Sequence, residues 1–140
     1  MLLTDLIHFI KTNRDQGKRT CFDIKHLQEW VEWAVKNKYA FISKNDKQDI
    51  NGVVVVCPIG KWSEMPNMEQ VIDSMGKHHT DTDYFIMDAL TKTKESRKEL
   101  VNKALERFND IESNPDTQLY ASVKDGIIKF NKQTILTLKN

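Results

Sequence analysis

The chain has 140 residues, 39% of them hydrophobic and 29% charged, which is ordinary usage for a globular protein. Its 21 basic and 20 acidic side chains leave a formal net charge of +1, which excludes a global electrostatic attraction to nucleic acid or anionic membranes. The length favours a single domain over residues 1–140 that can fold without disulfides. No window approaches about 18 consecutive apolar residues, and the N-terminus lacks signal-peptide features. We therefore expect a cytoplasmic protein with reduced thiols and no membrane partner.

The N-terminal part of the chain predicts two helices. Residues 2–12 place their apolar side chains on one helical face, and a polar break that contains Gly17 follows. The second helix begins after Asp23 as its N-cap and carries Trp30 in its apolar stripe. Basic residues at 36–38 suit the negative C-terminal end of that helix.

A β-hairpin is predicted next. Residues 39–43 have the composition of a strand, and the Asn51-Gly52 dipeptide is a strong turn signal. Residues 53–57 form a continuous β-branched run, which is typical of a central strand, and we expect Pro58 to end it.

The clearest supersecondary unit lies in the second half of the chain, after a short predicted helix at 68–75. A strand at 84–89 precedes a helix for which Ser96 and Glu99 fit a capping box. Another strand follows at 119–123, so the spacing predicts a right-handed crossover and a parallel strand pair.

The C-terminal residues 127–138 predict one or two further strands. The fold class is therefore α/β (α+β), with a mixed, mostly antiparallel sheet, a central parallel strand pair and flanking helices.

A candidate anion site lies between the strand at 84–89 and the helix that follows. Ligands of mixed sheets favour the gap beyond the carboxyl ends of parallel strands, and a helix start adds free N–H groups and partial positive charge. Four basic side chains surround this gap: Lys92, Lys94, Arg97 and Lys98. These features favour a phosphate or pyrophosphate site, and the alternative is a solvated helix start whose lysines bind nothing specific.

The element order, and the unit from Tyr84 to Val123, resemble the GNAT superfamily of acyl-CoA-dependent N-acyltransferases. The resemblance is closest to divergent members, the toxin-activating lysine acyltransferases and the GNAT-like proteins of bacteriophages. Residues 85–88 resemble the strand that holds pantetheine in that family. Residues 90–97 resemble the loop that grips the pyrophosphate of acetyl-CoA, and residues 119–123 resemble the splayed parallel strand.

The resemblance implies a GNAT-like fold and transfer of an acyl group from acetyl-CoA, or another acyl-CoA, to an amine-bearing acceptor. It implies that Asp88 is the base or orients the base, and that Tyr120 protonates the leaving thiolate. It also implies seven cofactor-binding residues: Met87, Ala89, Leu90, Lys92, Lys94, Ser96 and Arg97. It further suggests a phage source, which would place the protein in the host cytoplasm or the virion.

The main alternative is a non-catalytic interaction or virion structural protein built on the same scaffold. The family's loop carries spaced glycines that let phosphate approach the backbone, whereas residues 91–97 of this chain all carry side chains. In that case we expect a protein partner to bind near Trp33 or Trp62.

Three weaker alternatives concern metal, thiol and nucleic-acid chemistry. The metal candidates are His78, His79, Asp81 and Asp83, whose spacing matches no established zinc pattern, so we predict no metal site. Cys57 is a nucleophile only if a histidine lies beside it, and is otherwise a small core residue. Three lysines near the C-terminus have few aromatic neighbours and do not make a convincing nucleic-acid module: Lys129, Lys132 and Lys139.

Overall fold

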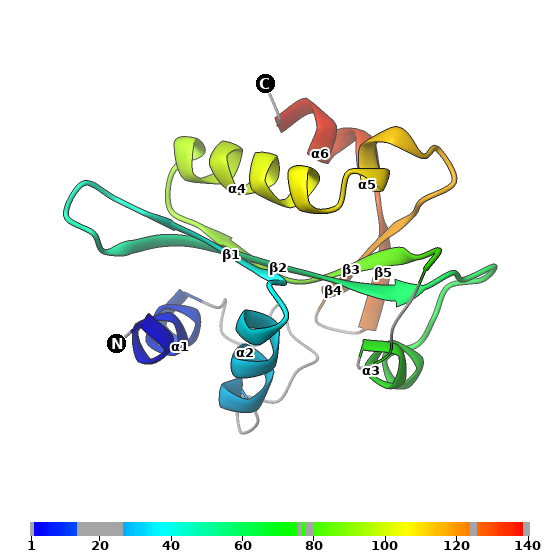
Figure 1. Ribbon diagram of the computed structural model, residues 1–140, viewed down its shortest axis with the longest axis horizontal. Coiled ribbons are helices and arrows are strands. Elements are labelled where there is room, and N and C mark those ends of the chain that lie inside the picture. The colour runs from blue at the N-terminus through cyan, green and yellow to red at the C-terminus, as the bar shows by residue number, and fades with distance from the viewer. Residues whose placement is uncertain (1, 14–26, 76, 78–79, 124–125, 139–140) are drawn as a thin grey trace.

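Five strands form one mixed sheet that separates two layers of helices in the computed structural model (Figure 1). The structure describes residues 2–13, 27–75, 77, 80–123 and 126–138. In chain order the elements are α1 (Leu2–Asn13), α2 (Leu27–Lys36), β1 (Ala40–Lys44), β2 (Ile50–Gly60), α3 (Met68–Met75), β3 (Asp83–Thr91), α4 (Lys94–Arg107), α5 (Asp110–Ser113), β4 (Leu119–Val123), β5 (Gly126–Phe130) and α6 (Lys132–Leu138).

The strands are ordered β1-β2-β3-β4-β5 across the sheet. The pair β3–β4 is parallel, and every other neighbouring pair is antiparallel. The predicted mixed sheet with a central parallel pair is therefore confirmed. The predicted N-cap Asp23 and the polar break around Gly17 lie outside the described residues.

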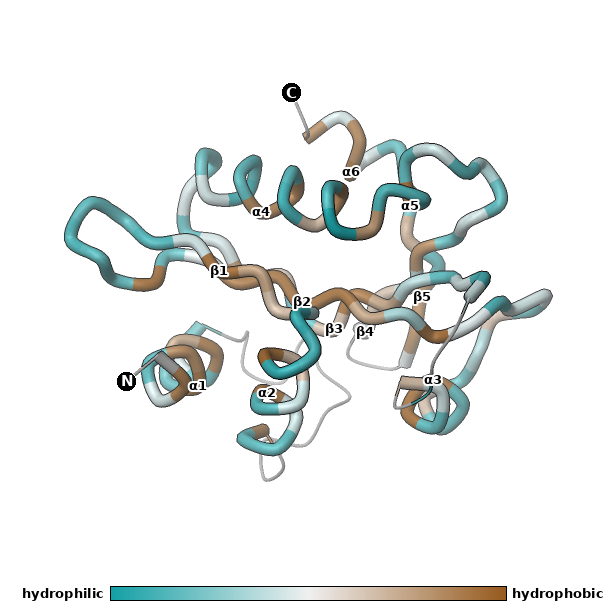
Figure 2. Tube along the Cα trace, in the orientation of Figure 1, coloured by the Kyte–Doolittle hydropathy of each residue, from teal (hydrophilic) through white to brown (hydrophobic). Residues whose placement is uncertain are grey.

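Each face of the sheet buries its own apolar cluster. Helices α1, α2 and α3 cover one face, while α4, α5 and α6 cover the other (Figure 1). The first cluster joins Leu6 and Ile10 of α1 to Phe85 of β3. The second cluster joins Val101 and Leu105 of α4 to Ile86 of β3 on the opposite face of the sheet. Apolar residues concentrate in the strands, whereas the turn between β1 and β2 is polar (Figure 2). Among the described residues, no helix has the length and apolarity required to cross a bilayer.

Gly52 lies inside β2, so the prediction that Asn51-Gly52 forms the hairpin turn is wrong. The turn forms earlier, where the Asn45 side chain accepts hydrogen bonds from the N–H groups of Lys47 (2.9 Å) and Asp49 (3.0 Å). Gly52 instead allows the start of α4 to approach the sheet closely. A β-carbon there would lie 2.7 Å from the Ser43 hydroxyl and closer still to the hydroxyl of Ser96.

Pro58 does not end β2, which continues to Gly60. Strand β1 pairs with β2 only as far as Ala40 opposite Val55, and the Val56 N–H then donates to the Tyr39 carbonyl at 3.0 Å. Backbone N–H groups of successive residues point to opposite edges of a strand, so the nitrogen of residue 58 points to the same edge as that of Val56. At residue 58 this edge is no longer covered by β1. A proline lacks an N–H and is tolerated at such an edge.

The last element is a helix, so the prediction of a second C-terminal strand is wrong. The Asn131 side chain accepts the N–H of Gln133 at 3.0 Å and favours a helix start. Ile135, Leu136 and Leu138 then pack against the cluster under α4. The short apolar run was ambiguous between strand and helix, and this packing decides it.

Candidate functional site

Strands β3 and β4 are paired over only the first part of their length. The register aligns Tyr84 with Leu119 and ends at Ile86 opposite Ala121, while β3 continues to Thr91. Beyond this point the Ser122 hydroxyl donates to the Met87 carbonyl at 3.3 Å. The carboxyl-terminal half of β3, from Met87 to Thr91, therefore has no backbone pairing with β4, and the splay that the resemblance implies stays a prediction.

Buried polar contacts hold the two strands together at their amino-terminal ends. The Asp83 carboxylate is 1% exposed and accepts hydrogen bonds from Lys61 Nζ at 3.1 Å, from the Trp62 N–H at 3.1 Å and from the Gln118 N–H at 2.9 Å. These donors come from the segment after β2 and the residue before β4. One carboxylate thus fixes the ends of three strands at the same point.

A β-bulge interrupts β3 next to the splay. Val55 of β2 lies opposite Asp88 and Val56 lies opposite Ile86, so Met87 is the extra residue. Met87 and Asp88 both line a small apolar space beneath α1 and α2. The bulge therefore turns two successive side chains toward the same layer of helices.

An open groove of about 370 Å³ lies at the end of β3. Its walls come from the end of β3, from α1 and from α4, and its lining residues are Phe9, Asn13, Ala89, Leu90, Thr91, Lys92 and Arg97. Both charged residues in this lining, Lys92 and Arg97, are cations. A guanidinium beside an ammonium is a donor set suited to phosphate or pyrophosphate oxygens.

Lys92 and Arg97 are positioned by contacts on either side of the groove. The Lys92 N–H donates to the Asn51 carbonyl at 2.9 Å, and its Nζ lies 5.7 Å from the centre of the Phe9 ring. Arg97 Nε donates to the Thr91 hydroxyl at 3.4 Å. The groove therefore depends on the position of α1 relative to the end of β3.

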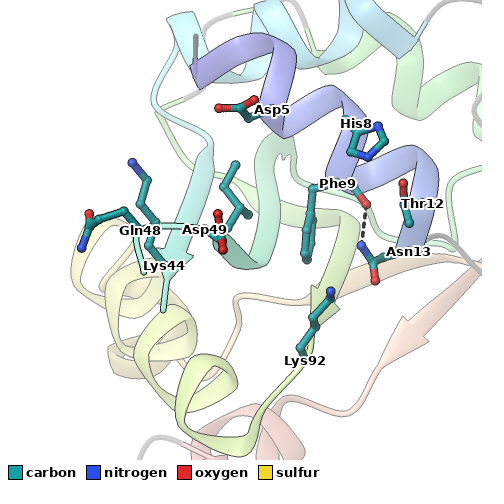
Figure 3. A pocket seen from close by; sticks show the side chains of 10 residues that line it. Asp5, His8, Phe9, Thr12, Asn13, Lys44, Gln48, Asp49 and Lys92 are labelled. Atoms are coloured by element: carbon teal, nitrogen blue, oxygen red, sulfur yellow. Dashed lines mark hydrogen bonds between the residues drawn. The ribbon is translucent and has the colours of Figure 1, made fainter. Parts of the chain in front are cut away.

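A second cavity of about 400 Å³ adjoins the groove and shares Phe9, Asn13 and Lys92 with it. It lies between α1 and the β1–β2 turn, and Phe9 extends from α1 toward Lys92 (Figure 3). Its other lining residues are Asp5, His8, Thr12, Lys44, Gln48, Asp49 and Ile50. This cavity differs from the groove because it contains two carboxylates.

Four of the seven predicted cofactor-binding residues line the groove together: Ala89, Leu90, Lys92 and Arg97. Met87 lines the apolar space on the α1–α2 side instead, and Lys94 is exposed in the first turn of α4. Ser96 is 3% exposed, and its hydroxyl hydrogen-bonds to that of Ser43 at 2.5 Å.

The N-cap of α4 is Thr93, so the predicted capping role of Ser96 is wrong. The Thr93 hydroxyl accepts the Ser96 N–H at 3.0 Å, and the Thr93 carbonyl accepts the Arg97 N–H at 3.1 Å. Threonine at 93 supplies the cap three residues before the position that the sequence pattern favoured. These two N–H groups are therefore engaged within the helix start, and the Lys92 and Arg97 side chains are the groups that face the groove.

The predicted catalytic residues lie in the core rather than in the open groove. Asp88 is 8% exposed and faces the space beneath α1 and α2, and Tyr120 is 3% exposed beside Phe85. Burial raises the pKa of Tyr120; the nearby Asp83 carboxylate raises it further and Lys61 lowers it. Asp83 and Asp88 stand near opposite ends of β3, so Tyr120 belongs to the end away from the groove.

Cys57 is fully buried, and its thiol donates a weak hydrogen bond to the Phe85 carbonyl at 3.7 Å. Burial raises the pKa of this thiol, and the charge of Asp88 raises it further. A protonated, inaccessible thiol is a poor nucleophile, so the core interpretation fits Cys57 better than the nucleophilic one.

The described residues contain no group of three or more potential metal-binding side chains. His78 and His79 of the predicted metal candidates lie outside the described residues, and Asp83 is engaged by Lys61. Lys132, considered above for nucleic acid, donates to the carbonyls of Asn114 and Thr117 at 3.0 Å each.

The two tryptophans proposed to face a partner are partly buried. Trp33 packs edge-on against Trp30 at 6.1 Å and against Tyr39 at 5.3 Å between ring centres. Trp62 donates its indole N–H to the Ile59 carbonyl at 2.8 Å. The larger exposed apolar side chains are scattered over several elements: Val35, Met65, Ile72 and Ile128.

Sequence reasoning missed the contribution of α1. Phe9 and Asn13 complete the groove, and Asp5 and His8 belong to the adjoining cavity. The only sequence signal was the polar face of the first helix, which did not indicate what that face would meet. No protein-family model, curated protein or solved structure matches the chain.

Proposed function

We propose that the chain is a GNAT-like N-acyltransferase that binds acetyl-CoA, or another acyl-CoA, in the groove at the end of β3. The observation that carries this proposal is that Lys92 and Arg97 both line one groove at the carboxyl end of β3, whose pairing with the parallel strand β4 ends at Ile86. Ligands of open mixed sheets favour this position. The bulge at Met87, next to the point where the pairing of β3 with β4 ends, adds a local change of backbone direction.

The groove fits the pyrophosphate of coenzyme A through side chains. Lys92 and Arg97 offer charge and hydrogen-bond donors, and neither takes part in an ion pair among the described residues. The ligand would thus be held by a guanidinium and an ammonium in place of the glycine-loop amides of the family. The acyl thioester supplies the activated carbonyl, and the protein's contribution would be to hold it against the acceptor amine.

Calorimetric titration with acetyl-CoA tests the cofactor claim directly. We expect saturable binding by the wild-type chain and at least about tenfold weaker binding by Arg97→Gln, because hydrogen bonds to charged groups contribute about 1.5–3 kcal/mol. Lys98→Gln is the matched control, because Lys98 is exposed on the same helix and does not line the groove. Absence of heat at millimolar ligand, or equal affinity of Arg97→Gln and wild type, would reject the proposal.

A second candidate is a non-catalytic interaction protein, favoured by the burial of both Asp88 and Tyr120. The roles of Asp88 as the base and of Tyr120 as the acid stay predictions. Asp88→Asn should abolish acyl transfer while leaving acetyl-CoA affinity unchanged if the enzyme proposal is right. Binding of acetyl-CoA without release of free thiol in the presence of any amine would favour the non-catalytic candidate.

A further inference from the structure

The two edge strands of the sheet, β1 and β5, are protected to different degrees (Figure 1). Because the Val56 N–H donates to the Tyr39 carbonyl, the backbone groups of Ile42 point to the outer edge of β1. Lys103 Nζ of α4 donates to the Ile42 carbonyl at 3.2 Å, and the Glu99 carboxylate lies 2.8 Å from the same ammonium. A charge held over an edge strand opposes the addition of another strand. The outer edge of β1 is therefore occupied by a side chain of the protein itself.

Strand β5 leaves the backbone groups of two residues at its outer edge. The Tyr84 N–H donates to the Gln118 carbonyl at 3.1 Å, so every second residue from Gln118 points its backbone groups to β3. The residues between them point to β5 and pair there with its even-numbered residues. The N–H and C=O groups of Ile127 and Lys129 therefore point away from β4. Among the described residues, none donates a hydrogen bond to these groups or accepts one from them.

Apolar surface lies beside this open edge. Ile128 of β5 is 43% exposed, and its partner Ala121 belongs to the apolar cluster on the α4 side of the sheet. Paired residues of neighbouring strands point to the same face, so Ile128 is on that face too. Helix α6 begins directly after β5 and packs against the same cluster, yet none of its residues is fully buried. The edge thus combines unpaired backbone groups with an incompletely covered apolar face.

We infer that β5 pairs with β5 of a second copy of this chain, antiparallel about a two-fold axis, and joins the two sheets into one. A two-fold contact uses the same surface on both copies, so the strand has to be complementary to itself. The register that sets Ile127 opposite Lys129 of the second copy meets this condition. It pairs the outward N–H and C=O groups of both residues in each copy, as in an ordinary antiparallel ladder.

The side chains of β5 favour this register. Ile128 lies opposite Ile128 of the second copy, and such a cross-strand pair of β-branched residues is stabilising. Gly126 lies opposite Phe130 and has open space where a β-carbon would stand, which an aromatic ring can cover. Lys129 lies opposite Ile127, so the charges of the two copies do not face each other directly. The chain's own sequence therefore supplies the partner that this edge fits.

Sedimentation equilibrium of the full chain between about 1 µM and about 500 µM tests the association. We expect conversion from monomer to dimer within this range. Ile128→Lys should raise the dissociation constant at least about tenfold, because it sets two ammonium groups opposite each other in place of the apolar pair. Ile72→Lys is the matched control, because Ile72 is 39% exposed on α3 and lies outside β5. It should dimerise like the wild type, and a wild-type chain that stays monomeric at about 500 µM would overturn the inference.

Cross-linking tests the register. In a Cys21→Ser background, whose other thiol at Cys57 is fully buried, Ile128→Cys should form a disulfide-linked dimer on air oxidation. Directly opposite residues of a non-hydrogen-bonded pair have Cα atoms about 4.5 Å apart, within reach of a disulfide. Lys129→Cys should not cross-link, because its two copies lie on a diagonal about 7–8 Å apart. Equal cross-linking of the two variants would contradict the inference.

Amide hydrogen exchange locates the contact without any substitution. The N–H groups of Ile127 and Lys129 should exchange more slowly where the dimer predominates than where the monomer does. The N–H of Ile128 is already bonded to β4, so its exchange should change little. A dimer in which Ile127 and Lys129 gain no protection would place the contact on another surface and overturn the inference.

Discussion

Replacing Gly52 with alanine should force the start of α4 away from the sheet. The new β-carbon would lie 2.7 Å from the Ser43 hydroxyl and 3.0 Å from Leu100 Cδ1, and closer than any real β-carbon contact to the Ser96 hydroxyl. All three neighbours are buried: Ser43, Ser96 and Leu100 are 2%, 3% and 0% exposed.

The expected cost has two parts. Overpacking a tight core typically costs about 1–3 kcal/mol, and loss of the buried hydrogen bond between Ser43 and Ser96 adds about 1 kcal/mol. We therefore expect Gly52→Ala to lower the free energy of unfolding by about 2–4 kcal/mol, measured as a lower urea midpoint at unchanged m-value. The displaced helix start should also move Arg97 and weaken acetyl-CoA binding.

A double-mutant cycle gives the decisive comparison. Ser96→Ala removes the nearest obstructing atom, so Gly52→Ala should cost much less in that background than in the wild type. Gly126 is the control, because it has open space around it and a φ of 144°, so alanine there tests backbone strain alone. The cost of Gly126→Ala should be the same in both backgrounds. A cost below about 0.5 kcal/mol for Gly52→Ala, or no relief from Ser96→Ala, would refute the steric argument.

Two further predictions concern buried titratable groups. Asp83→Asn should destabilise the fold by about 1–3 kcal/mol in urea titrations, because an amide keeps one acceptor oxygen for the three donors that the buried carboxylate now accepts. Asp81→Asn, at an exposed site, should have no measurable effect. In a Cys21→Ser background, stability should fall by about 1 kcal/mol between about pH 8 and about pH 9.5, because the unfolded thiol ionises above about pH 8.5 while burial raises the pKa of folded Cys57. Cys57→Ala should remove this alkaline loss; its persistence would contradict the assignment.

Local sequence patterns predicted most of the secondary structure because composition and capping act over a few residues. The predicted strands at 53–57 and 84–89 are both present, within β2 and β3. Strands β3 and β4 are parallel, as the spacing predicted. The pattern failed where a distant contact decides the outcome. The local pattern predicts a turn at Gly52, but glycine is needed there because the start of α4 packs against it. The pattern predicts a strand end at Pro58, but β2 continues because β1 does not pair with it at that position.

In the candidate site too, residues close together in the sequence were predictable and residues brought together by packing were not. Lys92 and Arg97 follow directly from the end of a strand and the start of a helix, so sequence could bring them together. Asp5 and Asp49 are far apart in the chain and line one cavity only because α1 lies beside the β1–β2 turn, which no local pattern encodes. Ser96 was misassigned because its position suits a cap, while Thr93 occupies that role.

The uncovered edge of β2 beyond Val55 offers an approaching peptide almost no donors. The Val56 N–H donates to the Tyr39 carbonyl, and Pro58 has no N–H. The irregularity between Pro58 and Gly60 then directs the Gly60 N–H to the Thr82 hydroxyl, on the β3 side, at 2.8 Å. A foreign strand would meet carbonyl oxygens without complementary N–H groups and could not extend the ladder. This stretch of β2 is therefore protected from strand addition although β1 does not cover it.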